Sequence, residues 1–240
     1  MNDQYMDVKP SNIKPPYAGA KAVVLLSGGM DSSTLLYNVL SNGYKAHALG
    51  FDYGQRHLKE LAAAQKIATK ARTPFKLISL ASVHDNILSH AGSSQTNESV
   101  RVPHGRYDDE SMKQTVVPNR NMMMLSIATS YAIVLKADIV AYAAHHGDHA
   151  IYPDCRHEFM ESIHATMRIC DWHPVSLYAP FREMRKENIA HHGKALGVPF
   201  DLTWSCYEGN DIHCGRCGTC VERKEAFVLS DVPDPTEYAA

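Results

Sequence analysis

Four cysteines near the carboxyl end of the chain could bind one metal ion. They lie within residues 206–220, at Cys206, Cys214, Cys217 and Cys220. Disulfide frameworks spread their cysteines through a small secreted domain, whereas this clustering in a reducing compartment points to metal. Four thiolates with C-x2-C spacing suit a closed tetrahedral site for a structural Zn²⁺, which is the metal we expect. An iron–sulfur cluster is the main alternative, because four nearby cysteines also suit one.

A stretch rich in glycine and serine near the start of the chain could hold phosphate groups. It reads SGGMDSS, from Ser27 to Ser33, between a predicted strand and a predicted helix. Its glycines let the backbone approach a phosphate closely, and the free N–H groups of a helix start attract anions. Its serine hydroxyls add donors, whereas Asp31 would repel phosphate unless it caps the helix or helps to hold Mg²⁺. The alternative is a tight turn that only requires glycine; the stretch is neither a Walker P-loop nor a G-x-G-x-x-G loop.

Alternating strands and helices would position this loop. The apolar run KAVVLL over 21–26 predicts a strand buried on both faces, followed by a helix over 31–43 and a second strand over 46–53. The alternation continues along the chain, with helices predicted at 57–72, 121–136, 156–170 and 184–197 and strands at 75–80, 137–144 and 175–180. This pattern favours an α/β fold with a doubly wound, mostly parallel sheet, whose ligands bind at the carboxyl ends of the strands.

The same pattern divides the chain into segments. Residues 1–20 are polar and contain prolines, and we expect a flexible extension there. We expect the α/β domain over 21–200 and a small zinc-binding segment over 201–240. Within the domain, residues 82–117 show no sustained period. A loop of this length in a compact domain is usually functional or disordered, so we expect a lid, with a disordered insertion as the alternative.

The composition excludes several classes of protein. The chain has 240 residues, 45% of them hydrophobic and 21% charged, which is typical of a globular protein with a sizeable core. Its net charge of -2 gives no overall attraction to nucleic acid or to a membrane surface. It contains no apolar run of about 18 residues and no hydrophobic signal-peptide core at its start, so we expect a cytoplasmic protein.

The glycine–serine loop and five further motifs carry a resemblance to known proteins. SGGMDSS resembles the pyrophosphate-binding loop (PP-loop) of the ATP pyrophosphatases, which share the adenine-nucleotide α-hydrolase-like fold. It is followed in order by FDYGQRH (51–57), VPNRN (117–121), HHGDHAIYPDCRHEF (145–159), PFREMRK (180–186) and WSCY (204–207). From about Lys21 to Tyr238, the chain resembles the 7-cyano-7-deazaguanine synthase family of queuosine biosynthesis.

This resemblance implies an ATP-dependent ligase. Such an enzyme adenylates the carboxylate of 7-carboxy-7-deazaguanine, lets ammonia attack to form the amide, and activates the amide with a second ATP to leave the nitrile. Adenylation is needed because a carboxylate is a poor electrophile and oxide is a poor leaving group. The resemblance further implies ATP, Mg²⁺ and one structural Zn²⁺, small-molecule substrates without direct nucleic-acid or membrane contact, and a homodimer.

The resemblance also implies roles for individual residues. Lys186 would neutralise charge at the α-phosphate, Arg120 would bind phosphate or carboxylate through its rigid fork, and Asp31 would support the loop or a metal. The nucleotide would contact the loop and the end of the second strand, at Leu26, Ser27, Gly28, Gly29, Met30, Asp31, Ser32, Ser33, Asp52, Tyr53 and Gln55. The deazaguanine would contact Asn121, Asp148, Tyr152, Asp154 and Arg156, with Asp148 or Asp154 accepting hydrogen bonds from its guanine-like edge.

Each of these residues also has a purely structural alternative. Lys186 could be a solvated helix lysine, Arg120 could form a surface salt bridge, and Asp154 could cap a helix. The residues that end the second strand could serve only the turn. Cys155 is expected to be a buried packing thiol, because no base is paired with it by sequence. The histidines of 145–149 lack a convincing ligand set for a metal.

Two other functions remain open at this point. A relative that stops at 7-amido-7-deazaguanine, for nucleic-acid modification, would carry the same motifs, and the mass of the product would distinguish it. The cysteine cluster could instead mark a zinc module that binds nucleic acid or protein. Such modules usually show a basic face. Residues 200–224 contain three arginines and lysines against four acidic residues, which disfavours this alternative.

Overall fold

The computed structural model describes residues 9–11, 13–106, 110–209 and 211–239, and it is built on one parallel sheet. The sheet has five strands in the order β3-β2-β1-β4-β5, and every neighbouring pair is parallel. The strands are β1 (Lys21–Leu25), β2 (Lys45–Asp52), β3 (Phe75–Ser79), β4 (Ile139–Ala141) and β5 (Ser176–Tyr178). The order reverses direction after β3, so the carboxyl ends of β1 and β4 flank the topological switch point where ligands bind.

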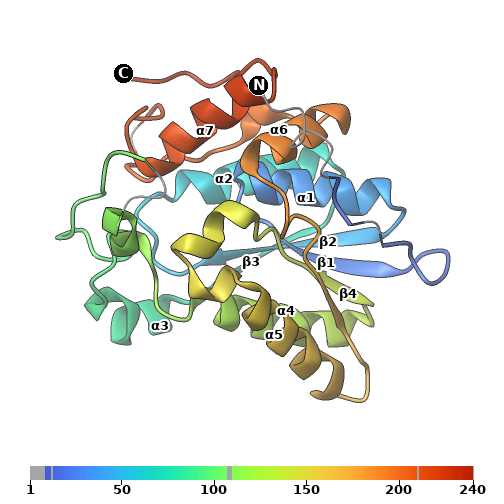
Figure 1. The fold of residues 1–240 in the computed structure, drawn as a ribbon. Helices are drawn as coiled ribbons and strands as arrows, with labels where there is room; N and C mark the ends of the chain where they lie inside the picture. Colours follow the sequence, from blue (N-terminus) through green and yellow to red (C-terminus); the bar gives the residue numbers. More distant parts are fainter. Residues whose placement is uncertain (1–8, 12, 107–109, 210, 240) are drawn as a thin grey trace.

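Helices cover both faces of the sheet, as a doubly wound fold requires (Figure 1). The helices α1 (Met30–Ser41), α2 (Lys59–Lys70) and α6 (Lys186–Ala195) share one apolar core with the sheet, and α4 (Arg120–Leu135) and α5 (His157–Ile169) share the other. Side chains of β1 alternate between the two cores, with Val23 in one and Val24 in the other. Both faces of this strand are therefore buried, which confirms the α/β fold class expected from its continuous apolar run.

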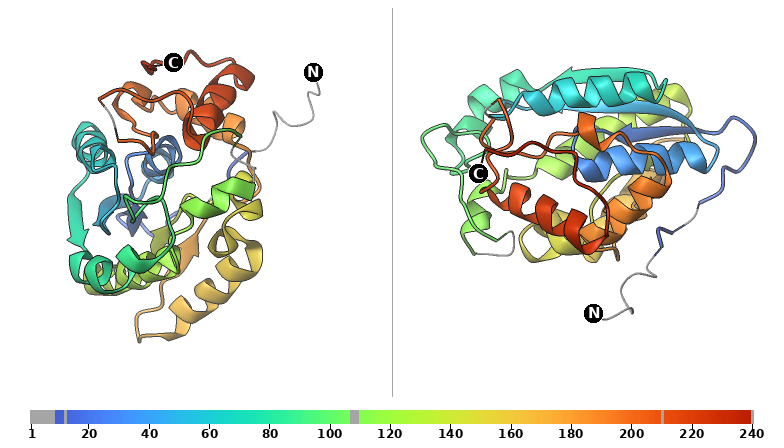
Figure 2. Two further views of the ribbon diagram at one scale, coloured as in Figure 1. Left: turned by 90° about the vertical axis from the view of Figure 1, so that its left-hand side faces the viewer. Right: turned by 90° about the horizontal axis from the view of Figure 1, so that it is seen from above.

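The C-terminal segment lies on the α1 side of the sheet and contains helix α7 (Gly218–Leu229) (Figure 2). Helix α7 packs on α6, which in turn packs on α1. The aromatic rings of Phe200 and Phe227 meet edge to face, 5.1 Å apart, in the small apolar cluster beneath α7. The segment is thus joined to the sheet through α6.

The described part of residues 82–117 packs against its surroundings. It contains helix α3 (Ala81–Asn86) and short 3-10 turns at Leu88–His90 and Glu110–Thr115. Arg56 donates hydrogen bonds to the carbonyl oxygens of Asn97 and Val100, at 3.0 and 2.9 Å. Val102 packs beside the four cysteines. A lid role for this segment stays a prediction.

Parts of the predicted N-terminal extension contact the sheet. Residues 1–8 and 12 lie outside the described residues, but the carbonyl oxygen of Ser11 accepts a hydrogen bond from the Tyr178 hydroxyl at 2.7 Å. The carbonyl oxygen of Lys14 accepts one from the Tyr44 hydroxyl at 3.2 Å. The domain boundaries at residues 20 and 200 remain predictions.

Two further features concern the helices and the surface. None of the helices found in the described ranges is long and apolar enough to cross a membrane. Trp172, in the turn that follows α5, is fully exposed to solvent.

Candidate functional site

A cavity of about 250 Å³ opens at the carboxyl ends of the strands, where the switch point predicts a ligand. The SGGMDSS loop forms one wall, and the ends of β2 and β4 form the next. The start of α4, the turns after β4 and the C-terminal segment close the remaining sides. Elements far apart in the sequence thus converge on one volume.

The loop is held open by hydrogen bonds between its own residues. The Ser27 and Ser32 hydroxyls lie 3.0 Å apart, and the Ser33 hydroxyl donates to the carbonyl oxygen of Gly29 at 2.7 Å. Gly29 precedes α1 and no side chain caps the helix, so the first N–H groups of α1 remain for a ligand. Gly28 has a φ of +92°, and a Cβ there would lie 2.7 Å from the backbone nitrogen of Ala64. Only glycine fits this close approach.

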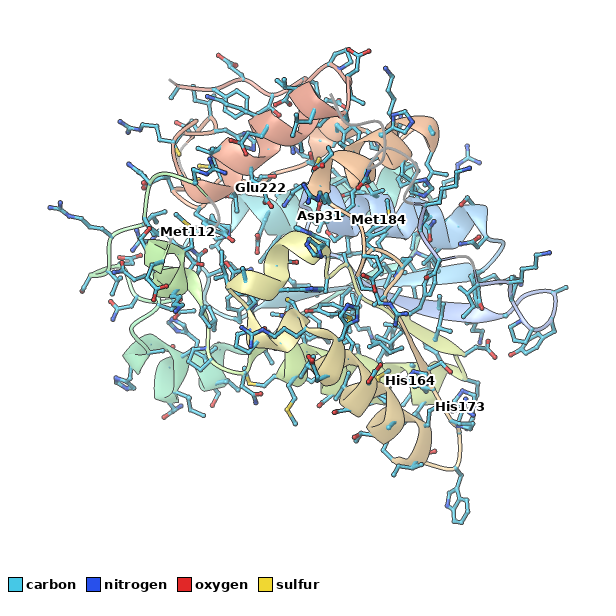
Figure 3. All side chains as sticks on the ribbon, viewed as in Figure 1. Asp31, Met112, His164, His173, Met184 and Glu222 are labelled. Atoms are coloured by element: carbon cyan, nitrogen blue, oxygen red, sulfur yellow. The ribbon has the colours of Figure 1, made fainter. Side chains whose placement is uncertain are left out.

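A buried cluster of charged residues lies beside the loop. The Lys186 ammonium is 3.0 Å from Asp31 Oδ2 and 2.7 Å from Glu222 Oε2. Figure 3 labels Asp31 and Glu222, which lie close together between α7 and the sheet. His145 Nδ1 accepts a hydrogen bond from the Gly147 N–H at 3.0 Å, and its Nε2 lies 3.6 Å from Asp148 Oδ1.

The charges in this cluster shift one another's titration. Burial disfavours the charged lysine, but Asp31 and Glu222 outweigh it and raise the pKa of Lys186. Burial alone would raise the pKa of Asp31, yet Lys186 and His145 lower it. Burial raises the pKa of Glu222 despite the attraction of Lys186. Lys186 is therefore charged at neutral pH, and Asp31 is ionised beside it.

Asp31 also carries an oxygen suited to a metal. Its Oδ1 is buried and has no hydrogen-bond partner among the described residues. An orphaned carboxylate oxygen beside a phosphate loop is the kind of ligand that Mg²⁺ takes together with substrate phosphates. Asp31 thus fits the expected Mg²⁺, although it does not cap α1.

The opposite side of the cavity is lined by neutral and aromatic groups. The Cys155 sulfur lies 3.1 Å from the Tyr142 hydroxyl, and the Asn121 amide donates to it at 3.6 Å. Burial raises the pKa of Cys155, so it stays a thiol. Arg120 donates to the Tyr53 hydroxyl at 3.3 Å, and burial raises the pKa of Tyr53 to about 12. This side offers flat surfaces and neutral donors, with one fixed guanidinium.

The structure brings most of the predicted site residues to this cavity. Those that line it are Leu26, Ser27, Gly29, Met30, Asp31, Ser32, Tyr53, Arg120, Asn121, Asp148, Tyr152 and Lys186. Gly28 and Ser33 shape the loop from behind.

Besides Gly28 and Ser33, four further predicted residues lie outside the cavity lining and make structural contacts. The Asp154 carboxylate accepts from the backbone N–H of Asn121 at 3.2 Å, at the start of α4. Asp52 accepts from the Gly54 N–H at 3.1 Å, and Gln55 donates to the Phe51 carbonyl oxygen at 3.0 Å. Arg156 donates to the carbonyl oxygen of His149 at 2.9 Å. The contacts of Asp52 and Gln55 are turn contacts of the kind that the sequence left open, whereas Asp154 contacts α4 rather than α5, the helix that follows it.

Sequence reasoning missed several residues at the site. The structure adds Tyr142, Cys155, Trp204 and Tyr207 to the cavity lining, and His145 and Glu222 to the charged cluster. Trp204 and Tyr207 belong to the WSCY motif, so the motif could have identified them as candidate site residues. Glu222 follows the last cysteine of the cluster, and nothing in its neighbourhood in sequence points to Lys186.

The four cysteines form a second candidate site, next to the cavity. Their sulfurs all lie within 4.8 Å of one another, and all four side chains are buried. Backbone N–H groups approach the sulfurs, with Cys214 N 3.3 Å from the Cys206 sulfur and Cys217 N 3.3 Å from the Cys214 sulfur. The Trp204 indole N–H donates to the carbonyl oxygen of Cys206 at 3.0 Å. Four converging thiols with N–H groups aimed at sulfur fit a metal held by four thiolates.

Comparisons with known proteins agree with this geometry. Residues 21–231 match the family model described as "Queuosine biosynthesis protein QueC". The 7-cyano-7-deazaguanine synthase of Caldicellulosiruptor saccharolyticus is 53% identical over 218 residues, which cover 91% of this chain and 95% of that protein. That of Methanoregula boonei is 50% identical over 91% of this chain and 99% of that protein.

Solved structures share the fold at low sequence identity. An NMN synthetase from Francisella tularensis superposes with a TM-score of 0.52 at 14% identity, over 91% of this chain and 79% of that one. The U34-tRNA thiolase NcsA from Methanococcus maripaludis, solved with its [4Fe-4S] cluster, gives 0.51 at 12% identity, over 90% of this chain and 66% of that one. Together with the sequence relatives and the motifs in their order, these findings show that the chain belongs to the QueC family of queuosine biosynthesis proteins.

Proposed function

We propose that the chain is a 7-cyano-7-deazaguanine synthase, an ATP-dependent ligase that converts 7-carboxy-7-deazaguanine and ammonia to the nitrile. One observation carries the proposal: the SGGMDSS loop with its charged lysine faces an aromatic wall that bears the Arg120 guanidinium, across a single cavity. A nucleotide and a flat heterocycle can therefore meet in one volume, and the names of the relatives supply the substrate.

The proposed reaction uses the phosphate site twice. The substrate carboxylate attacks the α-phosphorus of ATP and pyrophosphate leaves; ammonia then adds to the acyl carbon, AMP leaves, and a proton is lost. The resulting amide oxygen attacks a second ATP, pyrophosphate leaves again, and loss of AMP and of both N–H protons completes the C≡N bond. Each turnover consumes two ATP and produces two AMP and two pyrophosphate.

The charged side of the cavity would serve both adenylations. The loop N–H groups would hold the leaving pyrophosphate, and Lys186 would neutralise charge that develops at the α-phosphate. Asp31 would hold Mg²⁺, which supplies further neutralisation of phosphate charge when it is bound. Arg120 is fixed by its hydrogen bond to Tyr53 and would orient the substrate carboxylate or a phosphate.

The neutral side would bind the deazaguanine. Tyr53, Tyr152 and Tyr207 offer rings for a flat heterocycle, and Asp148 lies at the junction of the two sides. We favour Asp148 over Asp154 as the acceptor for the guanine-like edge, because Asp154 holds the start of α4. Asn121 and Arg156 stay weaker candidates for substrate contacts.

The cysteine cluster would hold one structural Zn²⁺ and fix the C-terminal segment. Zn²⁺ is favoured because four thiolates close its coordination and leave no position for a substrate. An iron–sulfur cluster is the alternative, and metal and sulfide analysis distinguishes the two. We also propose a cytoplasmic homodimer that acts on the free base without contacting nucleic acid; light scattering tests the dimer.

The reaction is tested by incubating the purified protein with ATP, Mg²⁺, ammonium and 7-carboxy-7-deazaguanine. Mass spectrometry reads the base, and chromatography reads the nucleotides. We expect the nitrile, with AMP and pyrophosphate formed in a ratio of two to each nitrile. Accumulation of the amide as the end product would favour the relative that stops at 7-amido-7-deazaguanine.

A further inference from the structure

Glu222 connects the cysteine segment to the phosphate loop. It lies on α7, whose first turn carries Cys220, and its side chain is 13% exposed. Its Oε2 is 2.7 Å from the Lys186 ammonium, and its Oε1 is 4.0 Å from His145 Nε2. A carboxylate is costly to bury, so this one needs a partner to offset its desolvation. Lys186 supplies that partner from a different helix.

The rotation of α7 is fixed from its other side. Arg223 is fully buried, and its guanidinium donates to the Thr203 hydroxyl at 2.8 Å, to the Thr236 hydroxyl at 2.8 Å and to the Phe200 carbonyl oxygen at 3.1 Å. These donors tie α7 to the chain before and after it. Because Glu222 and Arg223 are adjacent on the helix, anchoring Arg223 also aims Glu222 at Lys186, which lines the cavity.

Other groups must hold the Lys186 ammonium in place, because the lysine side chain is long and flexible. Lys186 is the first residue of α6, and its ammonium ends a flexible four-carbon stem. Asp31 holds the ammonium from the loop at 3.0 Å, and Glu222 holds it from α7 at 2.7 Å. Two carboxylates on separate elements therefore restrict the ammonium to the edge of the phosphate loop.

We propose that Glu222 is a positioning residue for the adenylation steps: it holds Lys186 at the phosphate loop and makes the C-terminal segment part of the nucleotide site. The proposal rests on the proposed function, because Lys186 is taken to act at the α-phosphate. Glu222 acts through Lys186 and needs no contact with ATP. The cysteine cluster contributes by fixing the first turn of α7.

The test compares Glu222→Gln with Glu225→Gln, the same change at an exposed position of the same helix. We expect E222Q to lower kcat for AMP release ten- to hundredfold, since a small displacement of a catalytic group costs up to about 10²-fold. We expect its KM for ATP to change less than threefold. The backbone N–H groups that would hold the phosphates remain, and the loss of a nearby negative charge does not weaken the binding of an anion. E225Q should match the wild type in both constants, and both variants should keep the wild-type metal content.

A double-mutant cycle shows whether the effect passes through Lys186. Single-turnover AMP release is measured for Lys186→Ala with and without E222Q. If Glu222 acts only by positioning Lys186, adding E222Q to K186A changes the rate less than threefold. An equal fold loss in both backgrounds overturns the proposal, and so does wild-type kcat in E222Q.

A structural role for Glu222 gives a different result. Glu222→Asp keeps the charge but withdraws it by one methylene, so a positioning role predicts a kcat between those of the wild type and E222Q. Loss of metal or of folding in both E222Q and E222D would overturn the proposal in favour of a structural role. Failure of the wild type to form the nitrile or the amide would instead contradict the proposed function. The ion pair between Lys186 and Glu222 would then serve only the stability of the fold.

Discussion

The two halves of the cavity wall are held in place by different forces. The sheet half rests on two extensive apolar cores, in which Val23, Leu35, Leu49 and Leu125 are fully buried. The C-terminal half has a small apolar cluster under α7, and among the described residues Val102 and three aromatic side chains pack around its cysteines. Hydrophobic burial alone can stabilise the first half, whereas the second has less of it, is held by the hydrogen bonds of Arg223, and would depend on metal coordination if the proposed zinc site is occupied.

Because of this difference, changes in the two halves should affect stability and activity differently. The residues proposed to bind phosphate come from the half that folds by burial, while Glu222, Trp204 and Tyr207 come from the half that carries the candidate metal site. Loss of the metal should therefore leave the sheet folded but the site incomplete. Changes in the sheet half should act on the stability of the whole chain or on single chemical steps.

Cys217→Ser should have the largest effect. Cys217 is fully buried and precedes α7, so its loss opens the metal site and releases the helix. We expect metal content near zero, nitrile formation reduced more than about 100-fold, and new protease cleavage within 201–236 while circular dichroism changes little. Cys170→Ser, at an exposed cysteine outside the cluster, is the control. Full metal content and activity in C217S would contradict the contrast between the halves.

Lys186→Ala should abolish chemistry without disturbing the metal. Loss of its charge leaves Asp31 and Glu222 facing the phosphates, and removal of one such group typically costs about 10²–10³ in kcat. AMP release and metal analysis measure the two properties separately. Lys194→Ala, at an exposed position of the same helix, should behave as the wild type. Wild-type turnover in K186A would remove this lysine from the site.

Gly28→Ala should affect stability before it affects chemistry. The added Cβ would collide with the backbone of α2 at a φ of +92°, so either the loop or α2 must move. We expect the free energy of unfolding to fall by about 2–4 kcal/mol in urea titrations. Gly92→Ala, where a Cβ meets nothing within 4 Å, should change it little. Similar losses in the two variants would show that the close approach is unimportant.

His192→Gln should have the smallest effect. It tests how the stability of the sheet half changes as the pH falls. Burial lowers the pKa of His192, whose Nε2 lies 3.0 Å from the Asn38 amide. Its contribution to stability is therefore fully present above the unfolded value of about 6.5 and is lost as pH falls through the lower folded pKa.

We expect the fall in unfolding free energy between pH 7.5 and 5.5 to be smaller in H192Q than in the wild type. The difference should be under about 1 kcal/mol, because solvent screens this half-buried ring. His191→Gln, at its exposed neighbour, removes the smaller of the two causes that lower the pKa of His192, so it should weaken the pH dependence less than H192Q does. A steeper fall in H192Q than in the wild type would contradict a lowered pKa for His192.

Local patterns predicted much of the fold and part of the site. The helix expected over 121–136 forms over Arg120–Leu135, and the strand expected over 75–80 forms over Phe75–Ser79, because each has its own apolar pattern. The cysteine cluster was predictable because its ligands are close in sequence. The contact between Lys186 and Glu222 was not, because it depends on how α6 packs against α7.

The choice between binding and structural roles also lay beyond the sequence. Asp154 precedes α5, where an aspartate can cap the helix or face a ligand, yet its carboxylate accepts from the backbone N–H of Asn121 on α4. A contact between segments so far apart in the chain cannot be predicted from the local sequence. Cys155 was expected to pack in the core, and it is buried, yet it also lines the cavity.

The placement of the two tryptophans gives the protein an optical reporter of its own. Trp172 is fully exposed in the turn after α5, outside the cavity lining, whereas Trp204 lines the cavity and donates its indole N–H to Cys206. Trp172→Phe would leave Trp204 as the single tryptophan, which can be excited selectively over the tyrosines. Its emission would then follow both occupancy of the thiol site and arrival of a nucleotide, without any added label.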